Sequence, residues 1–532
     1  MTSGVPQARP FSRHLADLCA ENAARDPERL AVISGAVTLT YAELDHQINL
    51  FAGGLARLGV QRDSTIGLLC TNRWEWLCTA IGATRIGARV AAFNTFARAW
   101  DLDYMIAHSQ AEVLVAVGAF RTRSYLETLA ELIPEIADTS WRSSRYPLLR
   151  EIVIVGDHTI PAGCRSLGDV LEEGEPFAGA HTSALDDAFV LYTSGSSARP
   201  KAVPMQHYGV IENSYGIGER MRLTHQDRVW LSVPLFWSYG AANALGATLT
   251  HQASLVLQEA FEPGEALDLI QEHGATVAYT LPNITKAMTE HRAFSRERVR
   301  TLRTGLTIGT PDDVRHAAQD LGIEQICSVY GSTETYGNCC VTPAEWPLER
   351  KATCQGPPLP GVRIRIHNTE TGQILGADEV GELQVAGYIA RGYLDTGESE
   401  NAAFGDDGWY RTGDLGFLDA EGCFHFVARA TEMIKTGGIN VSPGEVEEFL
   451  VLHKKVRSAA VVGAKDPDLG EAVVAFVVIE ADSGLTVEEL RSWCKTRIAA
   501  FKVPVRFHLV DELPKTDTGK LARRLLLELD TG

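Results

Sequence analysis

The sequence lacks several features that would point to common classes of protein. Its ten cysteines form neither a C-x-x-C pair nor a spaced metal-ligand set. Acidic residues exceed basic ones, 68 against 49, and the formal net charge of −19 argues against a nucleic-acid partner. No apolar run is long enough to span a bilayer, and the first residues lack the apolar core of a signal peptide. These absences predict a cytoplasmic protein with no membrane span and with reduced, mostly buried thiols.

The composition is that of a globular enzyme. The chain has 532 residues, 45% hydrophobic and 22% charged, which exceeds one ordinary domain and predicts at least two. The acidic balance does not exclude ATP, because a local basic cluster can outweigh a distant acidic surface.

Helical and strand-like segments alternate through most of the chain. Expected helices are 41–58, 74–86, 266–272 and 314–321, and expected strands are 65–70, 112–117, 276–280 and 325–329. This alternation predicts an α/β fold with largely parallel sheets. We expect an N-terminal domain over 1–428, whose part 355–428 is a β-rich subdomain, and an α+β C-terminal domain over 429–532.

A small-residue loop follows an apolar, strand-like run that ends at Tyr192. The loop residues are Thr193, Ser194, Gly195, Ser196 and Ser197, followed by Pro200 and Lys201. Small residues let backbone N–H groups and hydroxyls approach a phosphate chain, and the lysine adds a positive charge. The commoner phosphate loop has Gly before the lysine and Ser or Thr after it, whereas Pro200 and Ala202 stand here. A flexible surface loop is the alternative interpretation.

Two further turns carry carboxylates. In VYGSTET a strand ends at Tyr330, and Glu334 follows where parallel sheets bind ligands; a carboxylate there can hold Mg²⁺. In WYRTGDLG, Asp414 lies in a tight turn and is suited to accept both hydroxyls of a ribose. Taken alone, the first motif could be a capped turn and the second a hairpin turn.

Two more motifs lie near the C-terminus. ARATEMIKTGGINVSPGEVE contains the glycine pair Gly437-Gly438 and then opens a helix at Ser442-Pro443. PKTDTGK places Lys520 at the end of a polar loop, and in isolation this lysine would be a solvated side chain.

In this order, the five motifs resemble those of the acyl-adenylate-forming, AMP-binding superfamily, and most closely its acyl-CoA synthetases. The resemblance runs from about Leu39 to Lys520. It implies a large N-terminal domain of two α/β sheet layers plus a small β-barrel, followed by a smaller mobile C-terminal domain. It also implies that a carboxylic acid and ATP form an acyl-adenylate and pyrophosphate with Mg²⁺, and that the acyl group then passes to a thiol.

The resemblance assigns roles by position. The loop residues Thr193 to Ser197 and Lys201 would hold the β- and γ-phosphates, Thr333 the α-phosphate, and Glu334 the Mg²⁺. Adenine would lie between Tyr330 and the segment Gly309, Thr310 and Pro311. Asp414 would bind the ribose with Arg429 nearby. Lys520 would reach the α-phosphate and the acyl carboxylate, where a positive charge stabilises the transition state. Gly437 and Gly438 would line the thiol tunnel, and Thr431 stands at the hinge, where the family usually has Asp or Lys.

The acid pocket is expected around the segment PLFWSYG. Its residues are Trp237, Tyr239, Gly240, Ile308, Tyr336, Gly337 and Asn338. Amino-acid-activating relatives have an aspartate where Trp237 stands, so an α-amino acid is disfavoured and a hydrophobic aryl or alicyclic acid is expected. The acceptor is expected to be CoA. The alternatives are loading of a carrier-protein phosphopantetheine and, less favoured, a luciferase-like oxygenase.

Overall fold

The computed structural model describes residues 13–156, 158–177, 179, 182–193, 200–394, 401–429, 433–436, 439–441, 443–466, 469–481, 483–495, 497–498, 502–516 and 521–530. The chain divides into two compact units. One comprises Met1–Arg363 and Val385–Tyr410, and the other comprises Ile364–Gln384 and Arg411–Gly532.

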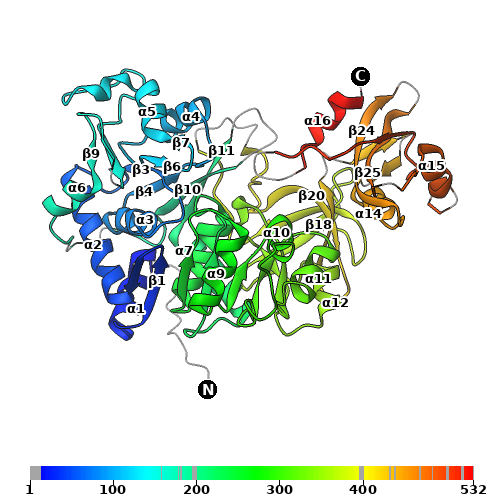
Figure 1. Cartoon of the computed structure of the whole chain (residues 1–532), viewed down its shortest axis with the longest axis horizontal. Helices are drawn as coiled ribbons and strands as arrows, with labels where there is room; N and C mark the ends of the chain where they lie inside the picture. The colour runs from blue at the N-terminus through cyan, green and yellow to red at the C-terminus, as the bar shows by residue number, and fades with distance from the viewer. Residues whose placement is uncertain are drawn as a thin grey trace. The chain divides into compact units, whose positions relative to one another are not determined.

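The first unit contains a mostly parallel sheet of strand order β17-β16-β15-β14-β12-β13-β1-β2. Its strands are β1 (Leu30–Ser34), β2 (Val37–Thr40), β12 (Arg228–Leu231), β13 (Ser254–Leu257), β14 (Val277–Tyr279), β15 (Thr304–Thr307), β16 (Gln325–Tyr330) and β17 (Cys340–Val341). The six inner strands, which are β16, β15, β14, β12, β13 and β1 in that order, pair in parallel. The edge strands β17 and β2 pair antiparallel to β16 and β1. Helices α9 (Pro263–His273), α10 (Pro282–Thr289) and α11 (Pro311–Gln319) connect the strands from β13 to β16 and lie over the sheet (Figure 1).

A second sheet of the same unit has the order β11-β10-β4-β3-β5-β8-β9. Its strands are β3 (Thr65–Leu69), β4 (Arg89–Ala92), β5 (Val113–Val117), β8 (Glu151–Val155), β9 (Arg165–Ser166), β10 (Asp187–Thr193) and β11 (Lys201–Gln206). Every residue of β3 and β5 is buried, as expected of parallel strands covered on both faces. The connecting helices are α2 (Tyr41–Arg57), α3 (Trp74–Ile86), α4 (Ala99–Ser109), α5 (Tyr125–Leu132) and α6 (Leu167–Glu173). The expected alternation of helices and strands is confirmed.

Local sequence explains where these helices begin. Thr40 caps α2 by accepting the Glu43 N–H, and the Glu43 side chain accepts the Thr40 N–H in return. Thr310 and Asp313 form the same reciprocal cap at α11, with Pro311 as its first residue. Such caps fix the direction in which a helix leaves a loop, and the second one includes Thr310 and Pro311 of an expected site segment.

Helix α7 (His207–Met221) joins the two sheets of the first unit. It packs on β15, β16, the π-helical segment η3 (Tyr239–Leu245) and α8 (Gly246–Thr250). Helix α1 (Leu15–Arg25) packs on α2, α3 and α8, and α12 (Leu348–Thr353) packs on α11 and β16. All residues of η3 and α8 are buried, so this segment belongs to the core.

The second unit is built from two smaller sheets. Strands β18 (Arg363–His367), β19 (Gly381–Ala386), β20 (Tyr410–Leu418) and β21 (Phe424–Arg429) form one, in that order. The other has the order β23-β22-β25-β24, with β26 (Arg506–Leu509) beside β25. Its remaining strands are β22 (Ile434–Thr436), β23 (Ile439–Val441), β24 (Val456–Asp466) and β25 (Gly470–Ile479), and its helices are α14 (Pro443–Val451), α15 (Val487–Lys495) and α16 (Arg523–Asp530) (Figure 1). The strand-rich stretch and the α+β segment after it are as expected, while the domain boundary near residue 428 stays a prediction.

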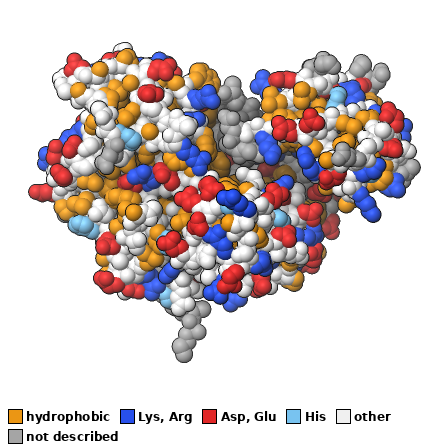
Figure 2. All heavy atoms as spheres, viewed as in Figure 1, with side chains coloured by type: hydrophobic (Ala, Val, Ile, Leu, Met, Phe, Trp, Pro, Cys, Tyr) orange, Lys and Arg blue, Asp and Glu red, His pale blue; other side chains and the backbone are white. Residues whose placement is uncertain are grey.

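The thiols and the surface agree with the composition. All ten cysteines are buried and none is in a disulfide, which confirms the expectation of reduced, buried thiols. Burial raises the pKa of the Cys164 thiol to about 11, so it stays protonated at neutral pH. Figure 2 shows acidic and basic side chains interspersed over the visible face. In the described part of the chain, no helix is both long and apolar enough to cross a bilayer.

Candidate active site

Three expected site segments leave the same edge of the larger sheet. They follow β12, β15 and β16, which are parallel, so their carboxyl ends lie together. The hydroxyls of Ser238, after β12, and Thr333, after β16, share a hydrogen bond of 3.2 Å although they are 95 residues apart in sequence. The structure thus brings the PLFWSYG and VYGSTET segments into direct contact.

Glu334 is a buried carboxylate in the short helix η4 (Thr333–Thr335). It is 7% exposed, and the Tyr393 hydroxyl donates to its Oε1 over 2.8 Å. The Ala390 N–H donates to its backbone oxygen over 2.7 Å. A neutral phenol does not offset the charge of a buried carboxylate, so the position suits a cation.

The donors around Glu334 fit Mg²⁺ held together with a nucleotide. Among the described residues, no group of three or more His, Cys, Asp or Glu side chains is placed to cage a metal ion. Mg²⁺ bound with ATP takes one or two carboxylates from the protein and its other ligands from phosphates and water. One buried carboxylate is therefore enough if a nucleotide supplies the phosphate ligands.

Tyr393 also contacts the expected phosphate loop. The Lys201 Nζ lies 4.6 Å from the centroid of the Tyr393 ring, a cation–π contact. Strands β10 and β11 pair Thr193 with Lys201, the described residues on either side of the expected loop. Lys201 and Glu334 therefore meet at one aromatic side chain.

Sequence reasoning missed Tyr393. In the sequence it is an aromatic residue after Gly392 in RGYLD, and no neighbouring motif marks it as a site residue. Tyr410, 5% exposed, lies near it, and burial together with the nearby Glu334 carboxylate and Tyr393 raises the pKa of its phenol. The Phe404 ring packs against both tyrosines, with centroids 5.3 Å from Tyr393 and 4.8 Å from Tyr410. The carboxylate therefore lies in a buried, aromatic surrounding, where a cation is attracted strongly.

The expected adenine segments lie at the ends of β15 and β16. Gly309 has φ of +139°, a conformation that favours glycine, and an added Cβ would lie 2.5 Å from the Asp313 carboxylate. Ile308, before it, is 41% exposed, and Tyr330 at the end of β16 is 8% exposed. Their contact with a nucleotide stays a prediction.

Trp237 belongs to an aromatic cluster. Its ring centroid is 5.8 Å from that of Phe236 and 6.5 Å from that of Phe96, a residue that is 42% exposed. Tyr239 is buried and donates its hydroxyl to the Thr280 carbonyl over 3.3 Å. An added Cβ at Gly240 would lie 2.2 Å from the Pro234 oxygen, so this tight bend requires glycine. The cluster gives the PLFWSYG segment an apolar, aromatic character.

The expected pocket residues 336–338 are held by the core. Tyr336 and Gly337 have φ of +57° and +99°. The Tyr336 ring is buried against Gly209 of α7, and its hydroxyl accepts the Gln206 N–H over 3.2 Å. The Asn213 side-chain amide donates to the carbonyls of residues 336 and 338, over 3.2 and 2.9 Å. The Tyr336 side chain therefore packs helix α7 against the loop.

Asp414 and Arg429 form a pair within the second unit. They stand opposite each other on β20 and β21, and the Arg429 Nε lies 3.3 Å from the Asp414 Oδ1. Asp414 is 8% exposed, whereas the arginine side chain is 63% exposed. The expected proximity of the two residues is thus present in the structure.

Several expected site residues lie outside the described residues. They are Ser194, Gly195, Ser196, Ser197, Thr431, Gly437, Gly438 and Lys520. Their roles stay predictions.

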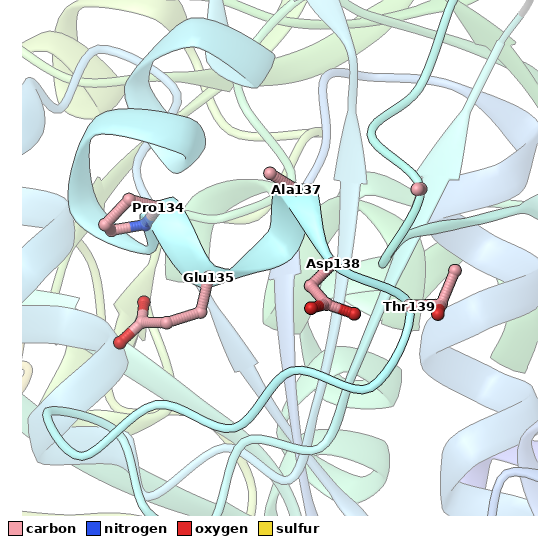
Figure 3. A pocket seen from close by; sticks show the side chains of 6 residues that line it. Pro134, Glu135, Ala137, Asp138 and Thr139 are labelled. Carbon is pink, nitrogen blue, oxygen red and sulfur yellow. The ribbon is translucent and has the colours of Figure 1, made fainter.

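A surface pocket of about 510 Å³ lies elsewhere in the first unit. It is lined by Pro134, Glu135, Ala137, Asp138, Thr139 and Ala162 (Figure 3). None of the expected site residues is among these, and Figure 3 shows two carboxylates, those of Glu135 and Asp138, among the side chains that line it. Two carboxylates would repel an acid or a triphosphate, so we do not place the active site there.

Comparison with protein-family models gives two matches. Residues 19–394 match the AMP-binding enzyme model, and residues 445–520 match the model of the AMP-binding enzyme C-terminal domain. Among curated proteins, a putative acyl-CoA synthetase, YngI, from Bacillus subtilis is 30% identical over 94% of both chains.

Solved structures of CoA ligases and related proteins are similar to this chain over nearly its whole length. ATP-bound MatB from Rhodopseudomonas palustris superposes with a TM-score of 0.85 at 27% identity, covering 97% of this chain and 98% of that one. The anthranilate CoA ligase AuaEII in complex with anthranoyl-AMP gives a TM-score of 0.85 at 25% identity, covering 98% of both chains.

Proposed function

The chain belongs to the family of AMP-binding enzymes, and from that premise we propose that it activates a hydrophobic aryl or alicyclic carboxylic acid. It is an AMP-forming acid–CoA ligase. In the first step the acid carboxylate attacks the α-phosphate of ATP, giving an acyl-adenylate and pyrophosphate. In the second step the CoA thiol attacks the acyl carbon, giving the thioester and AMP.

The joining of Lys201 and Glu334 at Tyr393 supports this proposal most strongly. A positive charge and a buried carboxylate at one site suit a magnesium–triphosphate complex. When bound, Mg²⁺ neutralises the leaving pyrophosphate. In this proposal Thr333 contacts the α-phosphate, and Lys520 stabilises the negative charge that develops when two anions react.

The aromatic cluster at Trp237 supports the choice of acid. The ring offers no charge to pair with an α-ammonium group, and burying an unpaired ammonium is costly. Its contacts with Phe96 and Phe236 make a surface on which a flat ring or an alicyclic group can pack. Trp237→Ala should therefore change the ranking of acids more than it changes the KM for ATP.

Lys520→Ala tests the assignment. We expect pyrophosphate release to fall by about 10²- to 10³-fold, the effect of removing one preorganised charged donor, with nearly unchanged ATP binding. Lys515→Ala, five residues earlier in the same segment, is the matched control and should keep full activity. Wild-type rates in Lys520→Ala would contradict the proposal.

A panel of carboxylic acids identifies the substrate and the acceptor. Pyrophosphate release is measured with each acid, and thioester formation is then measured with free CoA and with a phosphopantetheinylated carrier protein. Efficient thioester formation with CoA supports the proposal, and transfer only to the carrier protein would overturn the choice of acceptor.

A further inference from the structure

Asn243 is a buried amide with unused hydrogen-bonding capacity. It lies on η3 and is fully buried at 0% exposure. Among the described residues, neither its Oδ1 nor its Nδ2 has a hydrogen-bond partner. Buried amides are almost always paired, so a side chain that leaves both ends unpaired requires a reason.

The position of Asn243 supplies that reason. Tyr239 and Gly240, two expected pocket residues, lie on the same π-helical segment, about one turn earlier. The amide also abuts Gly337, a third expected pocket residue, because a Cβ added at that glycine would lie 2.4 Å from Oδ1 and 2.7 Å from Nδ2. Asn243 therefore lies on one of the segments that we expect to enclose the acid and abuts the other.

A second buried amide with an unpaired nitrogen follows the glycine that Asn243 abuts. Asn338 is 3% exposed and follows Gly337 directly, and its Nδ2 has no partner within the described part of the chain. The backbone around Gly337 is held in place by Asn213, which donates to the carbonyls on both sides of that glycine. The loop is thus fixed, and two side-chain amides remain available at its end.

These atoms define the chemistry of a ligand. Asn243 offers an NH₂ group with two donor N–H bonds and an acceptor oxygen, and the Asn338 NH₂ group offers further donors. A neutral group that both donates and accepts hydrogen bonds can pair with these atoms. A hydroxyl, with one donor and two acceptor lone pairs, is the simplest such group. A plain hydrocarbon would leave all of them unsatisfied, which costs free energy.

We propose that the acid carries a hydroxyl or a similar neutral hydrogen-bonding substituent, and that Asn243 recognises it with Asn338. This substrate class rests on the acid–CoA ligase function proposed above. It refines the expectation of a hydrophobic acid, because the ring or alicycle packs on aromatic side chains while its substituent binds the amides. Asn243 is then a specificity-determining residue.

Matched acids test this proposal. Benzoate is compared with its meta- and para-hydroxy derivatives and with meta- and para-methylbenzoate, whose substituents have a similar size without the hydrogen bonds. Cyclohexanecarboxylate with its hydroxy and methyl derivatives forms the alicyclic set. We expect the kcat/KM for pyrophosphate release to favour at least one hydroxylated acid over its methyl counterpart by about 10- to 100-fold.

The variant Asn243→Leu replaces the amide by an apolar group of similar size. We expect the preference for the hydroxylated acid to fall to about onefold or to reverse, mainly through the poorer use of that acid. Asn243→Ala serves the same purpose should the leucine variant not fold. Thr79→Val on α3 is the control, because it also removes a buried hydroxyl without a partner among the described residues but lies outside the expected site.

The outcomes separate this inference from the function on which it rests. The inference is overturned if Asn243→Leu keeps the preference for the hydroxylated acid, which is the result expected if an internal water pairs with the amides. It is also overturned if the wild type prefers the methyl compounds. Absence of pyrophosphate release with every acid would instead overturn the proposed function. Loss of the preference in Asn243→Leu but not in Thr79→Val supports the inference.

Discussion

Gly209 of α7 allows the Tyr336 ring to lie directly on the helix. A Cβ built at this glycine would lie 2.2 Å from the ring Cζ and 2.5 Å from the nearest Cε. Carbon atoms pack at about 3.5–4.0 Å, so Gly209→Ala requires the ring or the helix to move by more than about 1 Å. The ring has little freedom, because Gln206 holds its hydroxyl and Asn213 holds its backbone carbonyl.

Two opposing effects decide the magnitude. Alanine in a helix interior is favoured over glycine by about 1 kcal/mol. Inserting a methyl group into a well-packed core costs about 1–3 kcal/mol, and an overlap of this size belongs at the upper end of that range. We therefore expect Gly209→Ala to destabilise the first unit by about 1–2 kcal/mol.

Gly216→Ala is a matched control on the same helix. A Cβ there would meet the Pro360 Cδ at 3.4 Å, close to an ordinary van der Waals contact. The helix preference then dominates, and this variant should be about 0.5–1 kcal/mol more stable than the wild type. The two substitutions are chemically identical, so the sign of their difference depends on the Tyr336 contact alone.

Urea unfolding followed by tryptophan fluorescence measures both variants. Because Tyr336 precedes two expected pocket residues, Gly209→Ala should also lower the kcat/KM for the acid more than that for ATP. A Gly209→Ala protein as stable as Gly216→Ala would refute the packing assigned to Tyr336.

Three further variants probe the site and the core. Tyr393→Phe keeps the ring under Lys201 but removes the hydrogen bond to the Glu334 carboxylate. We expect the free energy of unfolding to fall by about 1.5–3 kcal/mol and the Mg²⁺ dependence of ATP binding, measured by calorimetry, to change. Unchanged values in both measurements would exclude a positioning role for the Tyr393 hydroxyl. Asp414→Asn removes a buried charge with little change in shape, and the KM for ATP should rise about tenfold if this carboxylate binds the ribose. Burial lowers the pKa of His207 to about 3, so the folded protein binds this proton less readily than the unfolded chain and stability falls as the pH drops below about 6.5. The loss should reach about 2 kcal/mol at pH 5, and His207→Asn, which can still accept the Leu15 N–H, should abolish that part of the pH dependence in unfolding measurements.

The sequence predicts the fold and the common edge of the site well, for physical reasons. Apolar runs at strand and helix periods specify parallel sheets, and parallel strands deliver their following loops to one edge. That rule is enough to bring Ser238 and Thr333 together, although 95 residues separate them. The α/β architecture was therefore accessible from the alternation of helical and strand-like segments, and the membership of the AMP-binding enzymes from the motifs and their order.

Residues that support the site were not predictable in this way. Tyr393 meets Glu334 across 59 residues, and Asn213 reaches the 336–338 loop across more than 120. No periodicity or motif marks such pairs, because their partners are set by the tertiary packing of α7 and the loops. Asn243 is the clearest case, since its surroundings in the sequence, YGAANALG, suggest only a small-residue core segment. Its significance comes from burial without a partner, which only coordinates reveal.

The arrangement at Tyr393 explains how a lysine and a glutamate can share a site without cancelling each other. Within the described residues, Lys201 and Glu334 form no ion pair, since the lysine lies over the face of the tyrosine ring and the carboxylate accepts from its hydroxyl. A direct ion pair would have to be broken before ATP and Mg²⁺ could bind, because each charge would already be compensated. The aromatic ring instead holds the ammonium by a weaker cation–π attraction, and the phenol holds the carboxylate by one hydrogen bond. Neither charge is therefore compensated by the other, and in the function proposed above the positive one would meet a phosphate and the negative one the metal that accompanies it.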